Sequence, residues 1–154
     1  MDNIIIRKAN IEDLETLLNF EQELIKAERP FDPTIKSDPV CYYELHKILV
    51  NSNAVVYVAE WTNKIVSCGS VTIRPARPYL DHKEFANFGF MYTVPEYRGR
   101  GINKRIMEQC KEWSLSRGFK EMRLTVYTDN QAAIWAYEKV GFKKHIIQMR
   151  LPLT

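Results

Sequence analysis

A glycine-rich turn between a strand-like and a helix-like segment is the part of this sequence that could most directly do chemistry. Residues 84–94 are rich in aromatic side chains, as expected of a strand buried on both faces, and residues 100–117 carry apolar side chains at helical spacing. The first turn of a helix has unpaired backbone N–H groups and a partial positive charge, and glycine lets a ligand approach the backbone closely. The turn Arg98-Gly99-Arg100-Gly101 therefore predicts a binding site for phosphate or pyrophosphate. Four basic side chains add positive charge there: Arg98, Arg100, Lys104 and Arg105.

Short glycine motifs also occur by chance, so the turn is equally compatible with a plain strand-to-helix connection whose arginines are solvated. Two other phosphate-binding loops do not fit. The P-loop pattern G-x-x-x-x-G-K-[ST] is absent from the sequence. The dinucleotide pattern G-x-G-x-x-G begins at Gly99 and Gly101 but has Lys104 in place of its third glycine.

The turn instead resembles the acetyl-CoA pyrophosphate loop of the GNAT acetyltransferase superfamily. That signature is Gln/Arg-x-x-Gly-x-Gly/Ala after a strand, often with Pro-Glu-Tyr-Arg leading into it. Arg98, Gly101 and the lead-in 95–98 match, whereas Asn103 stands where the family usually has Gly or Ala. Residues 130–142 are similar to the later motif of the superfamily, Asn-x-x-Ala-x-x-x-Tyr-x-x-x-Gly-Phe. The resemblance covers residues 84–150 closely, and the N-terminal half only through the order of its elements.

This resemblance implies an N-acetyltransferase that uses acetyl-CoA as cosubstrate and moves the acetyl group to a primary amine of a small molecule or peptide by direct attack. Tyr137 would be catalytic, donating a proton or hydrogen bond to the departing thiolate. Pantetheine would pair with the backbone of a splayed central strand, and the later helix would border the pantetheine arm and thioester. Taken singly, Asn130 is equally compatible with a helix cap and Tyr137 with a core aromatic. The cofactor-binding set implied is Met91, Tyr92, Thr93, Val94, Arg98, Gly99, Arg100, Gly101, Ile102, Asn103, Lys104 and Asn130.

The acceptor amine is expected between loop 28–36 and the tip around residues 77–82, because loops of this position flank the thioester in the family. Glu28 and Asp32 would attract a cationic amine, and Phe31 and Tyr79 would form a wall. Solvated charges and loop-anchoring aromatics are an equally good interpretation of these four residues.

The sequence does not identify the general base. Family members often carry a glutamate on the central strand, but residues 87–90 contain no carboxylate. Asp81, His82 and Glu84 lie just upstream and are candidates by proximity alone. An amine with a lowered pKa, or a chain of water molecules, would serve instead.

Composition indicates one soluble globular domain over residues 1–154, with 45% hydrophobic and 27% charged residues. A net charge of +3 is too small for a typical nucleic-acid binder, so no nucleic-acid partner is expected. Three widely spaced cysteines form neither a disulfide framework nor a zinc site, so no metal is expected. No apolar run approaches the roughly 20 residues of a membrane span, and the acidic start lacks the basic region of a signal peptide. We expect a cytoplasmic protein with no membrane partner. Its oligomeric state is not determined by the sequence, and a homodimer is possible.

Periodicity and turn residues predict the order β-α-α-β-β-β-α-β-α-β. The fold class expected is α/β (α+β), with a GNAT-like mixed, mostly antiparallel central sheet flanked by helices on both faces. Trp113 and Trp135 are predicted to be core residues of the last two helices. The predicted strands are residues 4–6, 54–60, 65–74, 84–94, 121–127 and 142–151. Of the four predicted helices, three begin after the capping residues Asn10, Asp38 and Asp129, and the other spans residues 100–117.

Two other functions remain compatible with these features. A regulatory protein that binds coenzyme A without catalysis would explain the missing carboxylate on the central strand, although Tyr137 in register argues against it. A nucleic-acid binder would use the same arginine-rich turn to contact phosphates, although the modest net charge argues against it.

Overall fold

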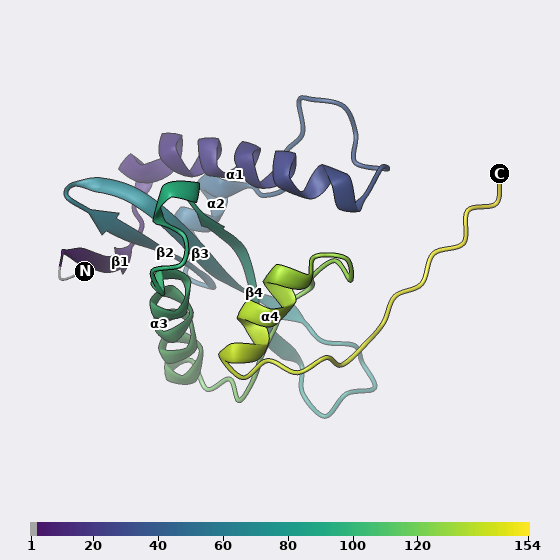
Figure 1. The fold of residues 1–154 in the computed structure, drawn as a ribbon. Helices are drawn as coiled ribbons and strands as arrows, with labels where there is room; N and C mark the ends of the chain where they lie inside the picture. Colours follow the sequence, from purple (N-terminus) through teal and green to yellow (C-terminus); the bar gives the residue numbers. More distant parts are fainter. Residues whose placement is uncertain (1–2) are drawn as a thin grey trace.

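The computed structural model describes residues 3–154 and contains one mixed sheet with helices on both faces (Figure 1). The strands lie in the order β1-β2-β3-β4-β5, antiparallel from β1 to β4, with β5 parallel to β4. This arrangement confirms the predicted fold class. The strands are β1 (Ile4–Lys8), β2 (Ala54–Trp61), β3 (Lys64–Pro75), β4 (Glu84–Thr93) and β5 (Met122–Arg123). The helices are α1 (Leu14–Glu28), α2 (Leu45–Val50), α3 (Ile102–Ser116) and α4 (Gln131–Lys139), with short 3-10 turns at Ile11–Asp13, Arg29–Phe31 and Pro95–Tyr97.

Two apolar cores form because the sheet is covered on both faces. Helices α3 and α4 pack on one face, where Phe88, Ile106 and Cys110 are buried. Helices α1 and α2 pack on the other, where Leu17, Leu45 and Phe90 are buried. The prediction that the aromatic strand is covered on both faces is confirmed, whereas its central position is confirmed only in part, because β5 pairs with β4 only at Ala86 and Asn87. No helix among residues 3–154 is both long and apolar enough to cross a bilayer.

A bulge in β4 changes the face of the sheet on which its side chains lie. Cys68 pairs with Tyr92 and Ser70 pairs with Gly89, so β4 contains one residue more than β3 across this interval. Phe88 and Phe90, two positions apart, would share a face in a regular strand, but they belong to the two different cores. Phe90 has φ of 48°, an uncommon conformation for a bulky residue.

The second helix is shorter than predicted. It begins at Leu45, whereas the sequence predicted a start after Asp38. The buried carboxylate of Glu21, on α1, accepts hydrogen bonds from the backbone N–H groups of Tyr42 (3.2 Å) and Tyr43 (2.8 Å). These bonds hold the chain in a loop because the two N–H groups are committed to a side chain instead of to a helical turn.

The C-terminal quarter departs most from the sequence-based expectation. The strand predicted at 121–127 is limited to Met122–Arg123, and the strand predicted at 142–151 does not form in the described chain. Residues 143–154 instead run outward from the body as an extended segment (Figure 1). Trp113 packs against the core as predicted, but Trp135 is 60% exposed, so its assignment to the core was wrong. Helix α4 covers a short stretch of sheet and leaves its outer face to solvent.

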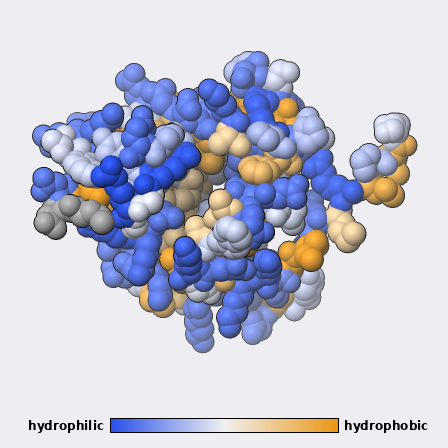
Figure 2. Space-filling view, viewed as in Figure 1, coloured by the Kyte–Doolittle hydropathy of each residue, from blue (hydrophilic) through white to orange (hydrophobic). Residues whose placement is uncertain are grey.

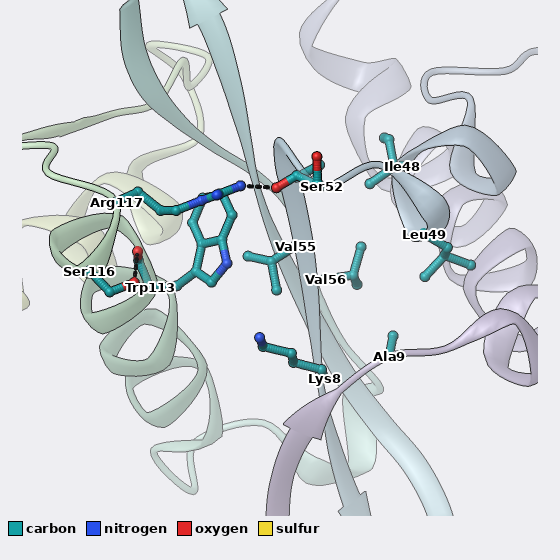
Figure 3. Close-up of a pocket in the computed structure, with 11 residues that line it drawn as sticks. Lys8, Ala9, Ile48, Leu49, Ser52, Val55, Val56, Trp113, Ser116 and Arg117 are labelled. Atoms are coloured by element: carbon teal, nitrogen blue, oxygen red, sulfur yellow. Dashed lines mark hydrogen bonds between the residues drawn. The ribbon is translucent and has the colours of Figure 1, made fainter.

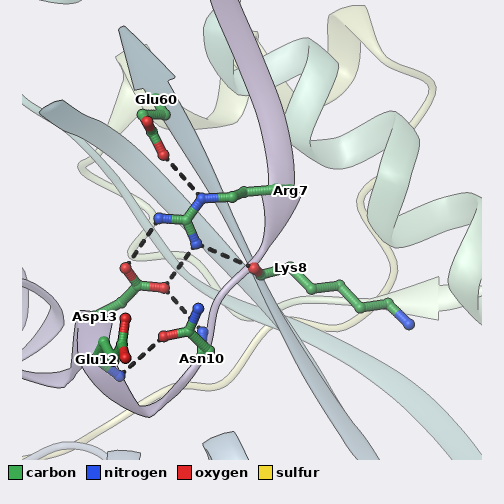
Figure 4. A network of polar contacts seen from close by, with 6 residues as sticks. All are labelled: Arg7, Lys8, Asn10, Glu12, Asp13 and Glu60. Carbon is green, nitrogen blue, oxygen red and sulfur yellow. Dashed lines mark hydrogen bonds and ion pairs between the residues drawn. The ribbon is translucent and has the colours of Figure 1, made fainter. Parts of the chain in front are cut away.

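A charged network fixes the start of α1 against the edge of the sheet (Figure 4). The Arg7 guanidinium donates two hydrogen bonds to Asp13, at 2.8 and 3.0 Å, and one to Glu60 at 2.8 Å. Asp13 also accepts the backbone N–H of Asn10, which completes the predicted capping box. Its hydrogen bonds with Arg7 lower the pKa of Asp13, and burial opposes this shift.

We expect Asp13→Asn to lower the free energy of unfolding by about 1–3 kcal/mol at neutral pH, since charge-assisted hydrogen bonds of that worth are lost. The pKa of Asp13 is lower in the folded than in the unfolded chain, where it is about 3.9. Its stabilising contribution is therefore present above that pH and lost below it. Urea unfolding at several pH values should show the difference between wild type and variant shrinking below about pH 4. Exposed Glu12 supplies the control, because Glu12→Gln should change little; equal losses in both variants would contradict the network's role.

Candidate active site

The turn between β4 and α3 presents a row of free backbone donors. Gly99 and Gly101 have φ of 74° and 73°, a left-handed conformation that glycine adopts without strain. Gly101 is the N-cap of α3, and no side chain caps this helix end. Within the described chain, the backbone N–H groups of residues 99–103 donate no hydrogen bond. Five consecutive free donors at a helix N-terminus are suited to an anionic group such as a pyrophosphate.

The two ends of the predicted phosphate loop are occupied within the chain. The N–H of Arg98 donates to the carbonyl of Pro95 at 3.2 Å, and the N–H of Lys104 donates to the side-chain oxygen of Asn103 at 2.8 Å. The structure therefore narrows the set of free backbone donors from 98–104 to 99–103. Asn103, which departs from the family signature, uses its side chain on its own helix turn.

The arginines around the turn stabilise its shape. Arg98 donates to the carbonyl of Thr93 at 3.0 Å, and Arg100 stacks over the ring of Trp61 at 4.8 Å. Arg105 was expected to add charge to the turn, but it donates to the carbonyl of Ile4 at 2.9 Å. Its guanidinium therefore ties α3 to the first strand. Of the four basic side chains named from the sequence, those of Arg98 and Arg100 contact the segments that flank the turn, and that of Lys104 lies 4.0 Å from Glu108 along α3.

Beside the turn, the outer edge of β4 is open. β5 pairs with β4 only at Ala86 and Asn87, so the rest of that edge has no strand neighbour in the described chain. The N–H of Val94 donates to Val66 on β3, so Val94 offers no free donor at the open edge. Backbone direction alternates along a strand, which turns the polar groups of Met91 and Thr93 toward the open side. Of the four residues predicted to pair with pantetheine, these two have the appropriate backbone direction.

Tyr43 holds the bulge next to this edge. Its hydroxyl accepts the N–H of Phe90 at 3.2 Å, and the two rings lie 4.9 Å apart. Glu21 binds the backbone of Tyr43 on the other side. Sequence reasoning missed both Glu21 and Tyr43, because their partners lie 22 and 47 positions away in the chain.

Tyr137, on α4, packs against the core that lies under α3. Its ring contacts Phe88 and Phe142 edge-on, at 6.2 and 5.9 Å between centroids. Burial, and to a smaller extent the charge of Glu28, raise the pKa of Tyr137 to about 12. The phenol therefore keeps its proton at neutral pH and is a hydrogen-bond donor. Asn130 caps the same helix by accepting the N–H of Ala133 at 3.3 Å, which is the structural role that the sequence left open for it.

A carboxylate surrounded by phenols lies at the end of α1. Glu28 is half-buried, and burial raises its pKa. The buried hydroxyl of Tyr42 lies beside it and has no well-formed hydrogen bond with any described residue. Burial also raises the pKa values of Tyr43, Tyr127 and Tyr137, and the negative charge of Glu28 adds to each shift. Glu28 is therefore within electrostatic reach of the bulge and of α4.

The other predicted acceptor residues divide into two groups. Phe31 stacks on Tyr127 with 5.8 Å between ring centroids, so it forms a wall near Glu28. Asp32 also lies at this end, but hydrogen bonds from Thr34, and to a smaller extent from Arg150 at 2.9 Å, lower the pKa of its carboxyl. Tyr79 is 74% exposed at the tip of the β3–β4 loop, where it accepts a hydrogen bond from Arg77. The structure does not bring Tyr79 to the other three residues.

The general-base candidates taken from proximity in sequence lie too far from the bulge. Glu84 begins β4, six residues before Phe90, which corresponds to about 20 Å along a strand. Asp81 and His82 pair with each other in the loop before it. Glu28 is instead the carboxylate whose charge acts on Tyr137. In the sequence, Glu28 was notable only as a charged residue at the end of a predicted helix.

Two partly open pockets lie away from the turn. A pocket of about 390 Å³ opens between α2, the start of β2 and the C-terminal end of α3, lined by residues such as Lys8, Ser52, Trp113 and Arg117 (Figure 3). A second, of about 500 Å³, lies along α1 beside Arg7 and Glu60. The free donors of residues 99–103 line neither of these two pockets.

Comparisons with known proteins agree with this geometry. An uncharacterised N-acetyltransferase of Methanocaldococcus jannaschii is 29% identical over 65 residues, 42% of this chain and 29% of that protein. The spermidine N(1)-acetyltransferase of Thermoplasma acidophilum is 28% identical over 151 residues, 92% of this chain and 89% of that protein. The chain spans only 29% to 30% of the length of the first curated relatives that it matches.

The fold is also shared with solved structures. The crystal structure of a predicted acetyltransferase with acetyl-CoA from Clostridium acetobutylicum has a TM-score of 0.75 at 20% identity, covering 97% of this chain and 96% of that chain. Residues 17–142, which contain both sequence motifs, match the acetyltransferase (GNAT) family. This match spans most of the sequence. The chain therefore belongs to the acetyltransferase (GNAT) family.

Proposed function

We propose that this chain is an N-acetyltransferase that moves the acetyl group of acetyl-CoA to a primary amine of a small cationic molecule. The observation that carries the proposal is the presence of two opposite charge environments, one at residues 99–103 and one at Glu28, whose charge acts on Tyr137. Free N–H donors at residues 99–103 favour an anion, and the half-buried carboxylate of Glu28 favours a cation. A pyrophosphate and an amine would therefore bind at opposite ends of one groove.

The cofactor would lie along the open edge of β4. The free donors of residues 99–103 would bind the pyrophosphate, and the outward backbone groups of Met91 and Thr93 would pair with pantetheine. Arg98 supports this arrangement because it already binds the carbonyl of Thr93 and so joins the two sites. Such a cofactor path would end near the bulge at Phe90, two residues from Phe88, whose ring Tyr137 contacts.

The acceptor would bind where Glu28, Tyr42, Phe31 and Tyr127 meet. An ammonium or amine N–H would pair with the Glu28 carboxylate and would also donate to the buried Tyr42 hydroxyl beside it, which has no well-formed hydrogen bond with a described residue. Aromatic rings beside a carboxylate suit a cationic amine. The similarity to a spermidine acetyltransferase is in keeping with an acceptor of this charge.

The reaction would proceed by direct attack. The neutral amine nitrogen would attack the thioester carbonyl, a C–N bond would form and the C–S bond would break. Tyr137 would donate a hydrogen bond to the departing thiolate, and the proton lost by the amine would pass to Glu28 or to solvent. Most of the rate would come from holding amine and thioester in contact.

Substitution at Gly101 tests the cofactor site, with Gly118 as a matched control. Both glycines have positive φ and nothing within 4 Å of an added Cβ, but Gly118 lies beyond the other end of α3. Each change to Glu should cost about 1–2 kcal/mol of stability through left-handed strain. Only Gly101→Glu adds a negative charge beside the free donors, so calorimetric titration should show at least a tenfold weaker affinity for acetyl-CoA. No binding by the wild type would overturn the cofactor assignment.

Turnover and the role of Tyr137 can be measured together by detecting free thiol from acetyl-CoA with spermidine as the first amine. We expect Tyr137→Phe to lower kcat by about 100-fold while the dissociation constant of acetyl-CoA stays the same, since one donor to the leaving group is removed. An unchanged kcat would remove Tyr137 from the mechanism. Binding of acetyl-CoA without turnover of any amine in a broad set would favour the regulatory alternative.

Recognition of the amine should depend on Glu28. Glu28→Gln should raise KM for a cationic amine at least tenfold and leave the affinity for acetyl-CoA unchanged, because the charge that pairs with the ammonium is lost. The pKa of Glu28 is raised, so as pH falls its carboxylate becomes protonated at a higher pH than that of an ordinary glutamate. Amine binding to the wild type should therefore weaken in that higher pH range. Exposed Glu15, at the opposite end of α1, provides the control. Equal KM values for Glu28→Gln and Glu15→Gln would contradict the assignment.

A further inference from the structure

A glycine in β4 leaves a small polar notch in the sheet. A Cβ added at Gly89 would lie 3.9 Å from the hydroxyl oxygen of Tyr43 and 3.9 Å from the amide nitrogen of Asn87. Apart from the two residues next to Gly89 in the chain, no other described residue has an atom within 4 Å of that position. The space therefore admits one added carbon without a clash, and two hydrogen-bonding groups border it. We call this space the β4 notch.

The β4 notch opens on the face of the sheet that α1 and α2 cover. Ala86 and Phe88 belong to the core under α3. Side chains alternate along a strand, so Asn87 and the position of a side chain at Gly89 are directed to the opposite face. Tyr43 packs against the core of that opposite face, which agrees with its place beside the notch.

The β4 notch adjoins the end of α1, where the acceptor amine is proposed to bind. The ring of Tyr43 contacts that of Tyr42 edge-on, with 5.9 Å between centroids, and the hydroxyl of Tyr42 lies beside the Glu28 carboxylate. Glu28 and Tyr137 both act electrostatically on the hydroxyl of Tyr43. The notch is therefore within electrostatic reach of the carboxylate and of the phenol assigned to the leaving group.

The groups around the notch have hydrogen-bonding capacity that the described chain does not use. The Tyr43 hydroxyl accepts the N–H of Phe90 at 3.2 Å, but its own hydrogen is donated to no described residue. Thr72 pairs directly with Asn87 across the sheet, so their side chains share a face. The buried hydroxyl of Thr72 has no hydrogen-bond partner among residues 3–154. Buried polar groups in folded proteins are nearly always paired, so this cluster is suited to a polar ligand.

The chemistry of these groups selects an uncharged hydroxyl over an ion. Burial raises the pKa of Tyr43 to about 12, so its phenol keeps a hydrogen to donate, which an ammonium group cannot accept. The negative charge of Glu28 adds to that pKa shift and disfavours an anion in the notch. A hydroxyl group both accepts and donates, so it would take the hydrogen of Tyr43 and give its own to the amide oxygen of Asn87.

We propose that the β4 notch binds a hydroxyl group of the acceptor, so that the amine acetylated by this chain is an amino alcohol. The proposal rests on the proposed function, because Glu28 would bind the amine while Tyr43 and Asn87 bind the hydroxyl. Figure 2 shows mostly hydrophilic residues on the side of the molecule from which Figure 1 shows α1 and α4, which suits a polar acceptor. A site that hydrogen-bonds a substrate hydroxyl discriminates against the analogue without it, because the polar groups of the site are then left unpaired.

Matched pairs of amines test the proposal, with turnover of acetyl-CoA followed through the free thiol. Ethanolamine is compared with propylamine, and propanolamine with butylamine, because a methyl group replaces the hydroxyl within each pair. We expect the wild type to prefer one of the hydroxylated amines by at least about tenfold in kcat/KM. Gly89→Ala fills the notch with a methyl group that meets no atom closer than 3.9 Å, and it should reduce this preference to about one. No preference in the wild type, or an equal preference in wild type and Gly89→Ala, would overturn the proposal.

Removal of the phenol hydroxyl gives a second test. Tyr43→Phe should also reduce the preference to about one, because the donor to the acceptor hydroxyl is lost. This change also leaves the N–H of Phe90 without its partner, so thermal unfolding is measured to show that the variant is folded. Tyr57→Phe removes a phenol hydroxyl on the other face of the sheet and should keep the wild-type preference. Equal preferences in Tyr43→Phe and Tyr57→Phe would contradict the role of Tyr43.

The ratio of two amines measured on the same protein is independent of the fraction of protein that is folded or loaded with acetyl-CoA. If every amine is acetylated but the members of each pair react equally, the notch assignment fails and the acetyltransferase proposal stands. If no amine is acetylated, the acetyltransferase proposal fails and the notch assignment falls with it.

Discussion

The backbone N–H of Phe90 donates a hydrogen bond to the hydroxyl of Tyr43 at 3.2 Å, at a point where a regular strand would pair with its neighbour. Phe90 adopts a left-handed conformation there, which costs a bulky residue about 1–2 kcal/mol. Burial of its ring against Tyr43 and the hydrogen bond from the thiol of Cys68 to its carbonyl offset this cost. Glu21 fixes the loop that carries Tyr43. The shape of β4 is thus determined by a chain of contacts that begins on α1.

The bulge has two consequences that a regular strand would not combine. It directs Phe88 to the core under α3 and Phe90 to the core under α1, so both faces of the sheet are filled from one short segment. Beyond it, β4 has no β5 neighbour, and its outer edge stays free beside the turn that leads into α3. The free edge and the free donors of residues 99–103 are therefore continuous, because the same strand leads into the turn.

Sequence reasoning succeeded where the site is local and failed where it is assembled from distant segments. The turn at 98–103 was predictable because glycine conformation, helix polarity and the lead-in residues all act within a few positions. Glu28 and Phe31 were found from their loop position, and the structure places them together with Tyr42 and Tyr127, which periodicity alone did not single out. Tyr79 stays a prediction, and its side chain lies at the exposed tip of a loop that is near the site only in element order.

The predicted last strand shows a different limit. An alternating apolar pattern indicates that a segment is suited to a sheet, but it does not indicate where the neighbouring strand lies. The pattern at 142–151 predicted a strand, but these residues form no strand in the described chain.

The environment of Tyr137 also decides which of its two predicted roles is physically reasonable. A free thiol has a pKa of about 8.5, and the pKa of Tyr137 is raised to about 12. Full proton transfer from this phenol to a thiolate would be unfavourable by about 3.5 pKa units, or roughly 5 kcal/mol, before any ligand alters the site. A hydrogen bond carries no such penalty and stabilises the developing negative charge on sulfur. The proton released by the amine therefore has an easier route through Glu28 or solvent, and the role left for Tyr137 is that of a fixed donor at the leaving group.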